Sequence, residues 1–169
     1  TDGQGLLLDL KSKGIELEGS NVLILGAGGS ARSVIPSLLS CNINSLSIAN
    51  RTPEKAAELV NIHKQNNPEI NQIEIDEKID TEIDLVVNST SAGTLGEEMT
   101  MPEGIFGLKT KSYDLSYSKD ETPFNMIAKR SGITEAYDGL GMLVNQAALS
   151  FEIWHNFKPD VDGIELQLR

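Results

Sequence analysis

The chain has 169 residues, which suffices for one ordinary domain with a hydrophobic core. Its formal net charge of −11 excludes a general nucleic-acid binder, because such a protein needs a basic face, and no apolar run is long enough to span a bilayer or to predict a membrane partner. The single Cys41 fits a reducing cytoplasm, and the two histidines, His63 and His155, lack the spacing of a zinc site.

Apolar, strand-like runs alternate with longer amphipathic segments along the chain. In chain order we predict a helix over residues 5–13, a strand over 22–25, a helix over 30–40, a strand over 46–49, a helix over 53–64, strands over 73–75 and 85–88, an irregular loop over 94–107, a strand over 112–115, a helix over 123–130, a strand over 134–137 and a helix over 139–154. This alternation is typical of βαβ units. We therefore predict one α/β domain, a doubly wound, Rossmann-like parallel sheet with helices on both faces.

The turn after the first predicted strand has the pattern G-x-G-x-x-A, formed by Gly26, Ala27, Gly28, Gly29, Ser30 and Ala31. The first glycine permits a tight turn, the second lets the backbone approach a pyrophosphate, and Ala31 is small enough for close packing of helix on strand. The N-terminus of the following helix offers free N–H groups and a partial positive charge to phosphates. The pattern predicts a dinucleotide site; the alternative is a tight turn that binds no ligand.

The end of the second predicted strand indicates which dinucleotide is bound. An NAD site usually has an acidic residue about 20 residues beyond the glycines, where it binds the ribose hydroxyls. Here the sequence is Asn50-Arg51-Thr52, so no carboxylate repels a 2′-phosphate and Arg51 can bind one. Thr52 can add a hydroxyl while it caps the next helix. The segment therefore favours NADP over NAD; the alternative is a solvated surface turn.

The remaining motifs resemble those of the shikimate dehydrogenases, including their quinate/shikimate relatives. The matching segments occur in the family's order and cover nearly the whole chain: TDGQG at 1–5, GAGGSA at 26–31, NRT at 50–52, NSTSAG at 88–93, DLSY at 114–117 and GLGMLVNQAA at 139–148. The resemblance implies an oxidoreductase that uses NADPH to reduce a small molecule, 3-dehydroshikimate, reversibly to shikimate. That reaction belongs to the chorismate pathway of aromatic amino-acid biosynthesis.

The resemblance also implies roles for individual residues. Cofactor contacts are implied for Asn88, Ser89, Thr90, Ser91, Gly139 and Met142, the last two beside the nicotinamide half. Substrate contacts are implied for Asp2, Tyr117 and Gln146. Asp2 also has an implied catalytic role, because the family's aspartate pairs with a lysine where hydride transfer builds negative charge on the carbonyl oxygen. From the residues alone, 88–93 fits a polar turn, Met142 fits ordinary core and Asp2 fits a solvated acid near a terminus.

In the family, the catalytic lysine belongs to a substrate domain that precedes the TDG segment. No lysine of this chain matches its position, and Lys11, Lys13, Lys109 and Lys111 are expected to be solvated. We therefore expect residues 1–169 to be the NADP-binding domain without the N-terminal substrate domain, able to fold but with little or no activity alone. We also expect the 5–10 helix to expose apolar surface.

Three other functions are compatible with parts of the sequence. A free-standing NADP-binding module that senses or docks, a quinate-preferring relative, and a methylene-tetrahydrofolate dehydrogenase share some of these motifs. The 139–148 block with Gln146 argues against the folate enzyme, whereas discrimination of quinate would depend largely on the absent half. The oligomeric state is not indicated by the sequence.

Overall fold

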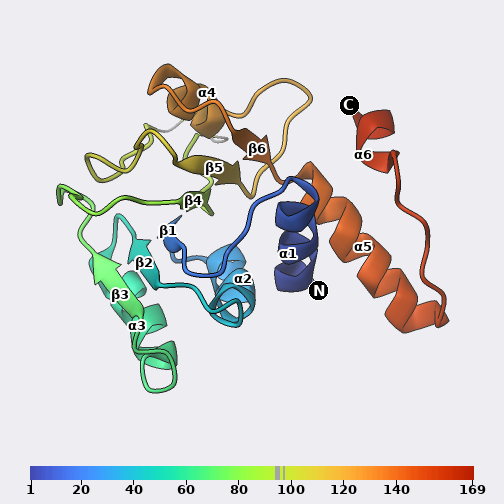
Figure 1. Cartoon of the computed structure of the whole chain (residues 1–169), viewed down its shortest axis with the longest axis horizontal. Coiled ribbons are helices and arrows are strands. Elements are labelled where there is room, and N and C mark those ends of the chain that lie inside the picture. The colour runs from blue at the N-terminus through green and yellow to red at the C-terminus, as the bar shows by residue number, and fades with distance from the viewer. Residues whose placement is uncertain (94–95, 97) are drawn as a thin grey trace.

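The computed structural model describes residues 1–93, 96 and 98–169 of the chain (Figure 1). Within these residues six strands form one parallel sheet with the order β3-β2-β1-β4-β5-β6. The strands are β1 (Asn21–Leu25), β2 (Ser45–Ala49), β3 (Ile70–Ile73), β4 (Leu85–Asn88), β5 (Lys111–Asp114) and β6 (Ala136–Asp138). The helices are α1 (Asp2–Ser12), α2 (Gly29–Leu39), α3 (Pro53–His63), α4 (Pro123–Arg130), α5 (Leu140–His155) and α6 (Ile164–Leu168).

The two faces of the sheet bury separate apolar clusters, because successive side chains of a strand point to opposite faces. Val22 and Ile24 of β1 pack in one cluster with side chains of α1, α2 and α3. Leu23 and Leu25 pack in the other cluster with Phe124 of α4. Both faces are thus covered by helices, and the predicted doubly wound α/β sheet is confirmed.

The strand order reverses between β1 and β4. From β1 the chain proceeds outward through β2 to β3, then returns across the sheet to β4 and proceeds to β5 and β6 on the other side. The loops that leave the carboxyl ends of β1 and β4 therefore diverge and leave a crevice between them. Ligands of open α/β sheets bind at this point.

Most predicted elements agree with the structure, and the differences have local causes. α1 begins at Asp2 rather than residue 5, because Gly5 N–H donates to the carbonyl of Thr1 at 2.8 Å and closes an extra turn. β3 lies over Ile70–Ile73 rather than 73–75, since buried Ile70 pairs with Leu46. β6 lies two residues later than predicted at its start. The short helix α6 was not predicted.

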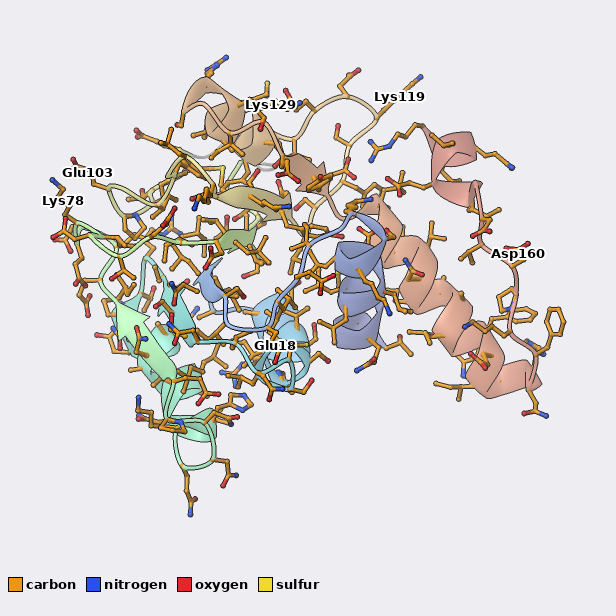
Figure 2. The ribbon with its side chains drawn as sticks, in the orientation of Figure 1. Glu18, Lys78, Glu103, Lys119, Lys129 and Asp160 are labelled. Carbon is orange, nitrogen blue, oxygen red and sulfur yellow. The ribbon has the colours of Figure 1, made fainter. Side chains whose placement is uncertain are left out.

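The segment predicted as an irregular loop lies between β4 and β5. Thr94, Leu95 and Glu97 lie outside the described residues. In the remainder of 94–107, the described residues form turns and one isolated bridge, in which Glu103 pairs with Lys78 (Figure 2). The Ile79 N–H donates to the Glu103 carbonyl at 2.9 Å, so this loop is tied to the segment that follows β3.

The expectation that the 5–10 helix exposes apolar surface holds for Leu8, which is 40% exposed, but not for the side of the helix that packs against its neighbours. α1 packs against α2 and α5, and Leu6 and Leu10 are buried. The contact with α5 is close: a Cβ added at Gly5 would lie 2.9 Å from the Gln146 Cβ and the Met142 carbonyl oxygen. Four further exposed apolar side chains lie at and beyond the end of α5, which Figure 1 shows extending away from the sheet; they are Phe151, Ile153, Trp154 and Phe157.

A charged side chain is buried where α1 meets β5. Asp9 is 1% exposed, its Oδ2 accepts a 2.6 Å hydrogen bond from the Tyr113 hydroxyl, and its Oδ1 lies 3.1 Å from Lys13 Nζ. Lys13 Nζ also lies 3.3 Å from Glu165 of α6 and stands over the Tyr137 ring. The expectation that Lys13 is solvated is therefore wrong. Its ammonium group compensates the buried carboxylate, which would otherwise be costly to desolvate.

The other three lysines expected to be solvated differ from Lys13. Lys11 and Lys109 are exposed, as predicted. Lys111 is half-buried at the start of β5, where its Nζ lies 2.8 Å from Glu135 Oε1. That pair links β5 to the segment preceding β6 and lies at the amino end of the sheet, away from the crevice.

The Asp9 cluster makes the fold sensitive to alkaline pH. Burial, with the nearby Asp9 charge, raises the pKa of Tyr113 far above its usual 10.0. Burial lowers the pKa of Lys13, but the Asp9 and Glu165 charges outweigh it and raise that pKa above 10.5. As the pH rises past the usual pKa values of 10.0 and 10.5, the unfolded chain loses the protons of Tyr113 and Lys13, whereas the folded chain keeps both. Stability therefore falls as the pH rises through this range.

We predict that the Tyr113→Phe variant loses stability less steeply at alkaline pH. Between about pH 10 and 11 its free energy of unfolding should decline less steeply than that of the wild type, by a difference that approaches about 1.4 kcal/mol per pH unit, the contribution of one proton, as the unfolded tyrosine becomes fully ionised. Urea denaturation at a series of pH values measures both slopes. Equal slopes would contradict the assignment of Tyr113 as a group that stays protonated in the fold.

Candidate functional site

The turn between β1 and α2 requires glycine at its first position. Gly26 has a φ of +104°, and an added Cβ would lie 2.6 Å from Ser89 Oγ of the loop after β4. Its N–H donates to the Ala49 carbonyl at 2.8 Å, which fixes the turn against the end of β2. Ala31, completely buried, lets α2 pack closely on the sheet.

The next two glycines leave the N-terminus of α2 open. Gly28 is the N-cap of α2 and Gly29 its first residue. In the described part of the chain, a Cβ added at either position would meet no atom within 4 Å. The first N–H groups of α2 therefore border open space, and a glycine cap has no side chain to occupy them. This arrangement fits a pyrophosphate, which binds to helix N-terminal N–H groups.

The loop after β4 forms the second wall. Ser89 donates both its backbone N–H and its hydroxyl to the Leu25 carbonyl, each at 2.8 Å. Thr90 Oγ1 donates to Asn88 Oδ1 at 2.7 Å, and Asn88 Nδ2 donates to Asp114 Oδ1 at 2.9 Å. The buried Asn88 amide is thus engaged within the protein, so it shapes the loop, whereas Ser89, Thr90 and Ser91 line the cleft.

The segment after β2 forms a basic rim. Arg51 and Thr52 are exposed, and Asn50 Nδ2 donates to the Thr52 carbonyl at 2.8 Å. Thr52 is the N-cap of α3 as predicted, but its hydroxyl makes no capping bond to the described residues. Lys55 follows in the first turn of α3 and lines the same cleft as Arg51. Two cations therefore stand at the carboxyl end of β2, the neighbour of β1.

These walls enclose one cleft of about 260 Å³. The predicted residues that it brings together are Gly26, Ala27, Gly28, Asn50, Arg51, Thr52, Ser89, Thr90 and Ser91. Sequence reasoning missed Lys55, Ile75, Glu98, Met99 and Thr100. Lys55 had a usable signal, since it lies four residues after Arg51 at the start of a predicted helix. The others come from irregular segments without periodicity.

Of the remaining predicted residues, Gly29, Ser30 and Ala31 lie in α2 and Asn88 ends β4, whereas the others lie on or near α5 and α1. The Gly139 N–H donates to the Ser116 carbonyl at 2.9 Å, and a Cβ added at Gly139 would lie 2.3 Å from the Leu115 carbonyl oxygen. Met142 is buried in the first turn of α5 and belongs to the core cluster. Tyr117 is exposed in the loop after β5.

Asp2 and Gln146 lie on two helices, α1 and α5, that pack against each other. The backbone of Gly5 packs against Gln146, and Thr1 Oγ1 lies 3.1 Å from Ser150 Oγ. Asp2 therefore lies in the first turn of α1, alongside this part of α5, and is ordered as part of a helix.

The ends of β4 and β5 carry a buried polar pair. Burial raises the pKa of the Asp114 carboxyl, and hydrogen bonds from the Ser116 N–H and the Asn88 amide partly oppose that shift.

In the described residues, no group of three or more histidine, cysteine, aspartate or glutamate side chains is arranged to hold a metal ion. Nor does any helix there have the length and apolarity needed to cross a membrane.

Two family models match the sequence of this chain. The model described as shikimate/quinate 5-dehydrogenase matches residues 9–103, and that described as shikimate 5′-dehydrogenase C-terminal domain matches residues 139–169. The chain belongs to the shikimate/quinate 5-dehydrogenase family. The resemblance found in the sequence motifs is thereby confirmed, and the two matched regions contain the glycine turn and α5.

Curated relatives of this family member match over its whole length. Shikimate dehydrogenase (NADP(+)) of Vibrio campbellii is 43% identical and that of Psychromonas ingrahamii is 46% identical, in both cases over 100% of this chain. The alignments cover 60% and 61% of those relatives. The chain thus spans about three fifths of the length of the relatives it matches.

Solved structures of related proteins share the fold of this family member. The Ael1 enzyme from Pseudomonas putida has a TM-score of 0.89 at 35% identity, covering 99% of this chain and 61% of its own. Shikimate 5-dehydrogenase from Thermus thermophilus, in complex with NADP(H) and shikimate, has a TM-score of 0.80 at 31% identity, covering 98% of this chain and 60% of its own. Both match the complete layered sheet described above.

We predict that Asn88→Ala destabilises this family member by about 1–3 kcal/mol, because it removes a buried donor to Asp114 and the acceptor of Thr90. Urea denaturation at neutral pH measures the change. The control is Asn66→Ala, at an exposed position after α3, which should leave the stability within about 0.5 kcal/mol of wild type. A change at Asn88 no larger than that at Asn66 would show that the pair contributes little.

Proposed function

We propose that residues 1–169 are the NADP-binding domain of a shikimate dehydrogenase, which reversibly reduces 3-dehydroshikimate to shikimate with NADPH. The observation that carries this proposal is the juxtaposition of the open glycine turn with Arg51 and Lys55 in one cleft. The residues of the segment after β2 that line the cleft include these two cations and no carboxylate, which suits a 2′-phosphate. The names of the curated relatives and the NADP(H) complex of the T. thermophilus enzyme support it.

Different residues of the cleft bind different parts of the cofactor. The N–H groups at the start of α2 bind the pyrophosphate, to which the helix presents its positive end. Arg51 and Lys55 bind the 2′-phosphate, and the Thr52 hydroxyl adds a donor at the same rim. Ile75 and Met99 provide an apolar surface for the adenine. The predicted cofactor contacts through Ser89, Thr90 and Ser91 extend this site toward the end of β4.

The α1–α5 junction provides one side of the substrate site. NADPH, when bound, supplies a hydride to the substrate carbonyl. Gln146 offers a donor and an acceptor to the hydroxyl groups of the ring, and the Asp2 carboxylate orients a cation and accepts from a substrate hydroxyl. Tyr117, exposed after β5, adds a further hydroxyl. We assign the proton donor to the family's lysine, whose position has no match among residues 1–169.

The family model covers both shikimate and quinate dehydrogenases, so quinate is the alternative substrate. The two substrates share a ring hydroxyl pattern that Gln146 and Asp2 would contact in the same way. Relative rates of oxidation of shikimate and quinate by the longer family protein distinguish them.

An NADPH-dependent reaction and a single, half-buried Cys41 fit the reducing cytoplasm, which stays a prediction.

We predict that the chain binds NADPH more tightly than NADH and that Arg51 carries most of the difference. Arg51→Ala should weaken NADPH binding about 10- to 100-fold, since a hydrogen bond to a charged group contributes about 1.5–3 kcal/mol. Lys55→Ala should cause a smaller loss, and neither variant should alter NADH binding. Calorimetric titration measures all four effects.

The control for this titration is Arg130→Ala, an exposed arginine at the end of α4, which should leave NADPH binding unchanged. Equal affinities of the wild type for NADPH and NADH would contradict the role of Arg51 in binding the 2′-phosphate. Absence of binding of either cofactor would contradict the proposed function itself.

We also predict that the 169-residue chain, tested alone, reduces 3-dehydroshikimate at least about 100-fold more slowly than a complete family enzyme, because general acid catalysis contributes about 10²–10⁴-fold. The assay follows NADPH oxidation at 340 nm with saturating substrates. Turnover near that of the complete enzyme would mean that residues 1–169 supply their own proton donor.

A further inference from the structure

The first turn of α5 rests on two side chains from elsewhere in the fold. A Cβ added at Gly141 would lie 2.0 Å from Asp9 Oδ1, so the Asp9 carboxylate lies directly against the α5 backbone. The Tyr113 hydroxyl donates to that carboxylate at 2.6 Å. The pair thus joins α1 and β5 to the first turn of α5.

This support takes the place of a conventional cap. The N-cap of α5 is Gly139, which has no side chain to accept from the first N–H groups. The Leu140 N–H donates to Asp138 Oδ1 at 3.2 Å. The start of the helix is therefore held by an acceptor from the end of β6 and by the contact of the Asp9 carboxylate with its backbone.

Ion pairs hold the Asp9 and Asp138 carboxylates in place. Arg169 donates to the two carboxylate oxygens of Asp138 at 3.0 and 2.7 Å and to Glu165 at 3.1 Å. Glu165 also pairs with Lys13, which pairs with Asp9. The charges form a continuous path from Asp9 on α1, through α6, to Asp138 at the end of β6. Neither carboxylate can move without breaking a link in this path.

We propose that Tyr113 and Asp9 are positioning residues, which set the first turn of α5 against the nicotinamide half of the cofactor. The proposal rests on the proposed function, in which Gly139 and Met142 contact that half. Gly139 abuts the Leu115 carbonyl with no room for a side chain, so a small shift of the helix start changes the space left there. Hydride transfer depends on such sub-ångström placement.

The test separates the two halves of the cofactor. Adenosine 2′,5′-bisphosphate carries the adenosine and the 2′-phosphate but lacks the nicotinamide, so its binding depends on the glycine turn and the basic rim alone. We expect Tyr113→Phe to weaken NADPH binding about 10-fold, the loss of one buried hydrogen bond, and to leave binding of the bisphosphate unchanged. Calorimetric titration at 20 °C, well below the thermal midpoint of each variant, measures both affinities.

The matched control is Tyr137→Phe. Tyr137 is the β6 neighbour of Tyr113 in the sheet, but its hydroxyl donates to Glu135 at 3.2 Å rather than toward α5. Removal of this hydroxyl should change neither affinity. Comparing Tyr113→Phe with Tyr137→Phe therefore separates the effect of the Tyr113 hydroxyl from the general effect of replacing a tyrosine in the sheet.

If Tyr113 and Asp9 had a purely structural role, Tyr113→Phe would weaken the binding of NADPH and of the bisphosphate equally, or would weaken neither. Either result would overturn the proposal. Failure of the wild type to bind either ligand would instead overturn the proposed function, and the inference with it. If Tyr113→Phe does not fold, Asp9→Asn provides the same comparison, because it keeps the shape of the side chain and removes the charge that holds Lys13. A selective loss for NADPH supports the proposal, and an equal or absent loss overturns it.

Discussion

The cleft exists because the chain leaves β1 and β4 in opposite directions. These two strands are hydrogen-bonded neighbours, yet one leads to β2 and the other to β5. Their loops must nevertheless touch at the carboxyl edge, where Gly26 meets Ser89 with no space for a side chain. Glycine at this point allows both the positive φ and the close contact. The geometry of the two cleft walls therefore depends on the absence of a Cβ at residue 26.

The fold places two cations beside a helix N-terminus on a strongly acidic protein. With a net charge of −11, the chain cannot attract a phosphorylated ligand through its overall field. Attraction must be short-range, and it comes from the α2 N-terminus together with Arg51 and Lys55. A site built in this way resists screening by salt better than a diffuse basic surface does, because its contacts are much shorter than the Debye length.

Sequence reasoning recovered the elements whose signals are local. The glycine turn, Pro53 at the start of α3 and the α4 boundaries follow from side-chain chemistry over a few residues. Most of the cofactor cleft was predicted for the same reason. The substrate-side residues needed the family resemblance, because nothing near Asp2 in the sequence indicates that Gln146 lies beside its helix.

The features that were missed depend on tertiary contacts. α6 has only five residues and is held by ion pairs to Asp138 and Lys13, which no local pattern reveals. Asp9 had a partial signal, since it falls at core spacing between Leu6 and Leu10, but its partner Tyr113 lies 104 residues away. β3 was misplaced because a four-residue strand has too few positions for its periodicity to decide its limits.

The exposed end of α5 has a practical consequence for optical studies. Trp154 is the only tryptophan, it is 76% exposed, and it stands in the last turn of α5, whereas the residues that contact the sheet are in the first turn. Its emission will therefore be that of an indole in water. Quenching or a blue shift of this signal will report when another surface covers the end of the helix.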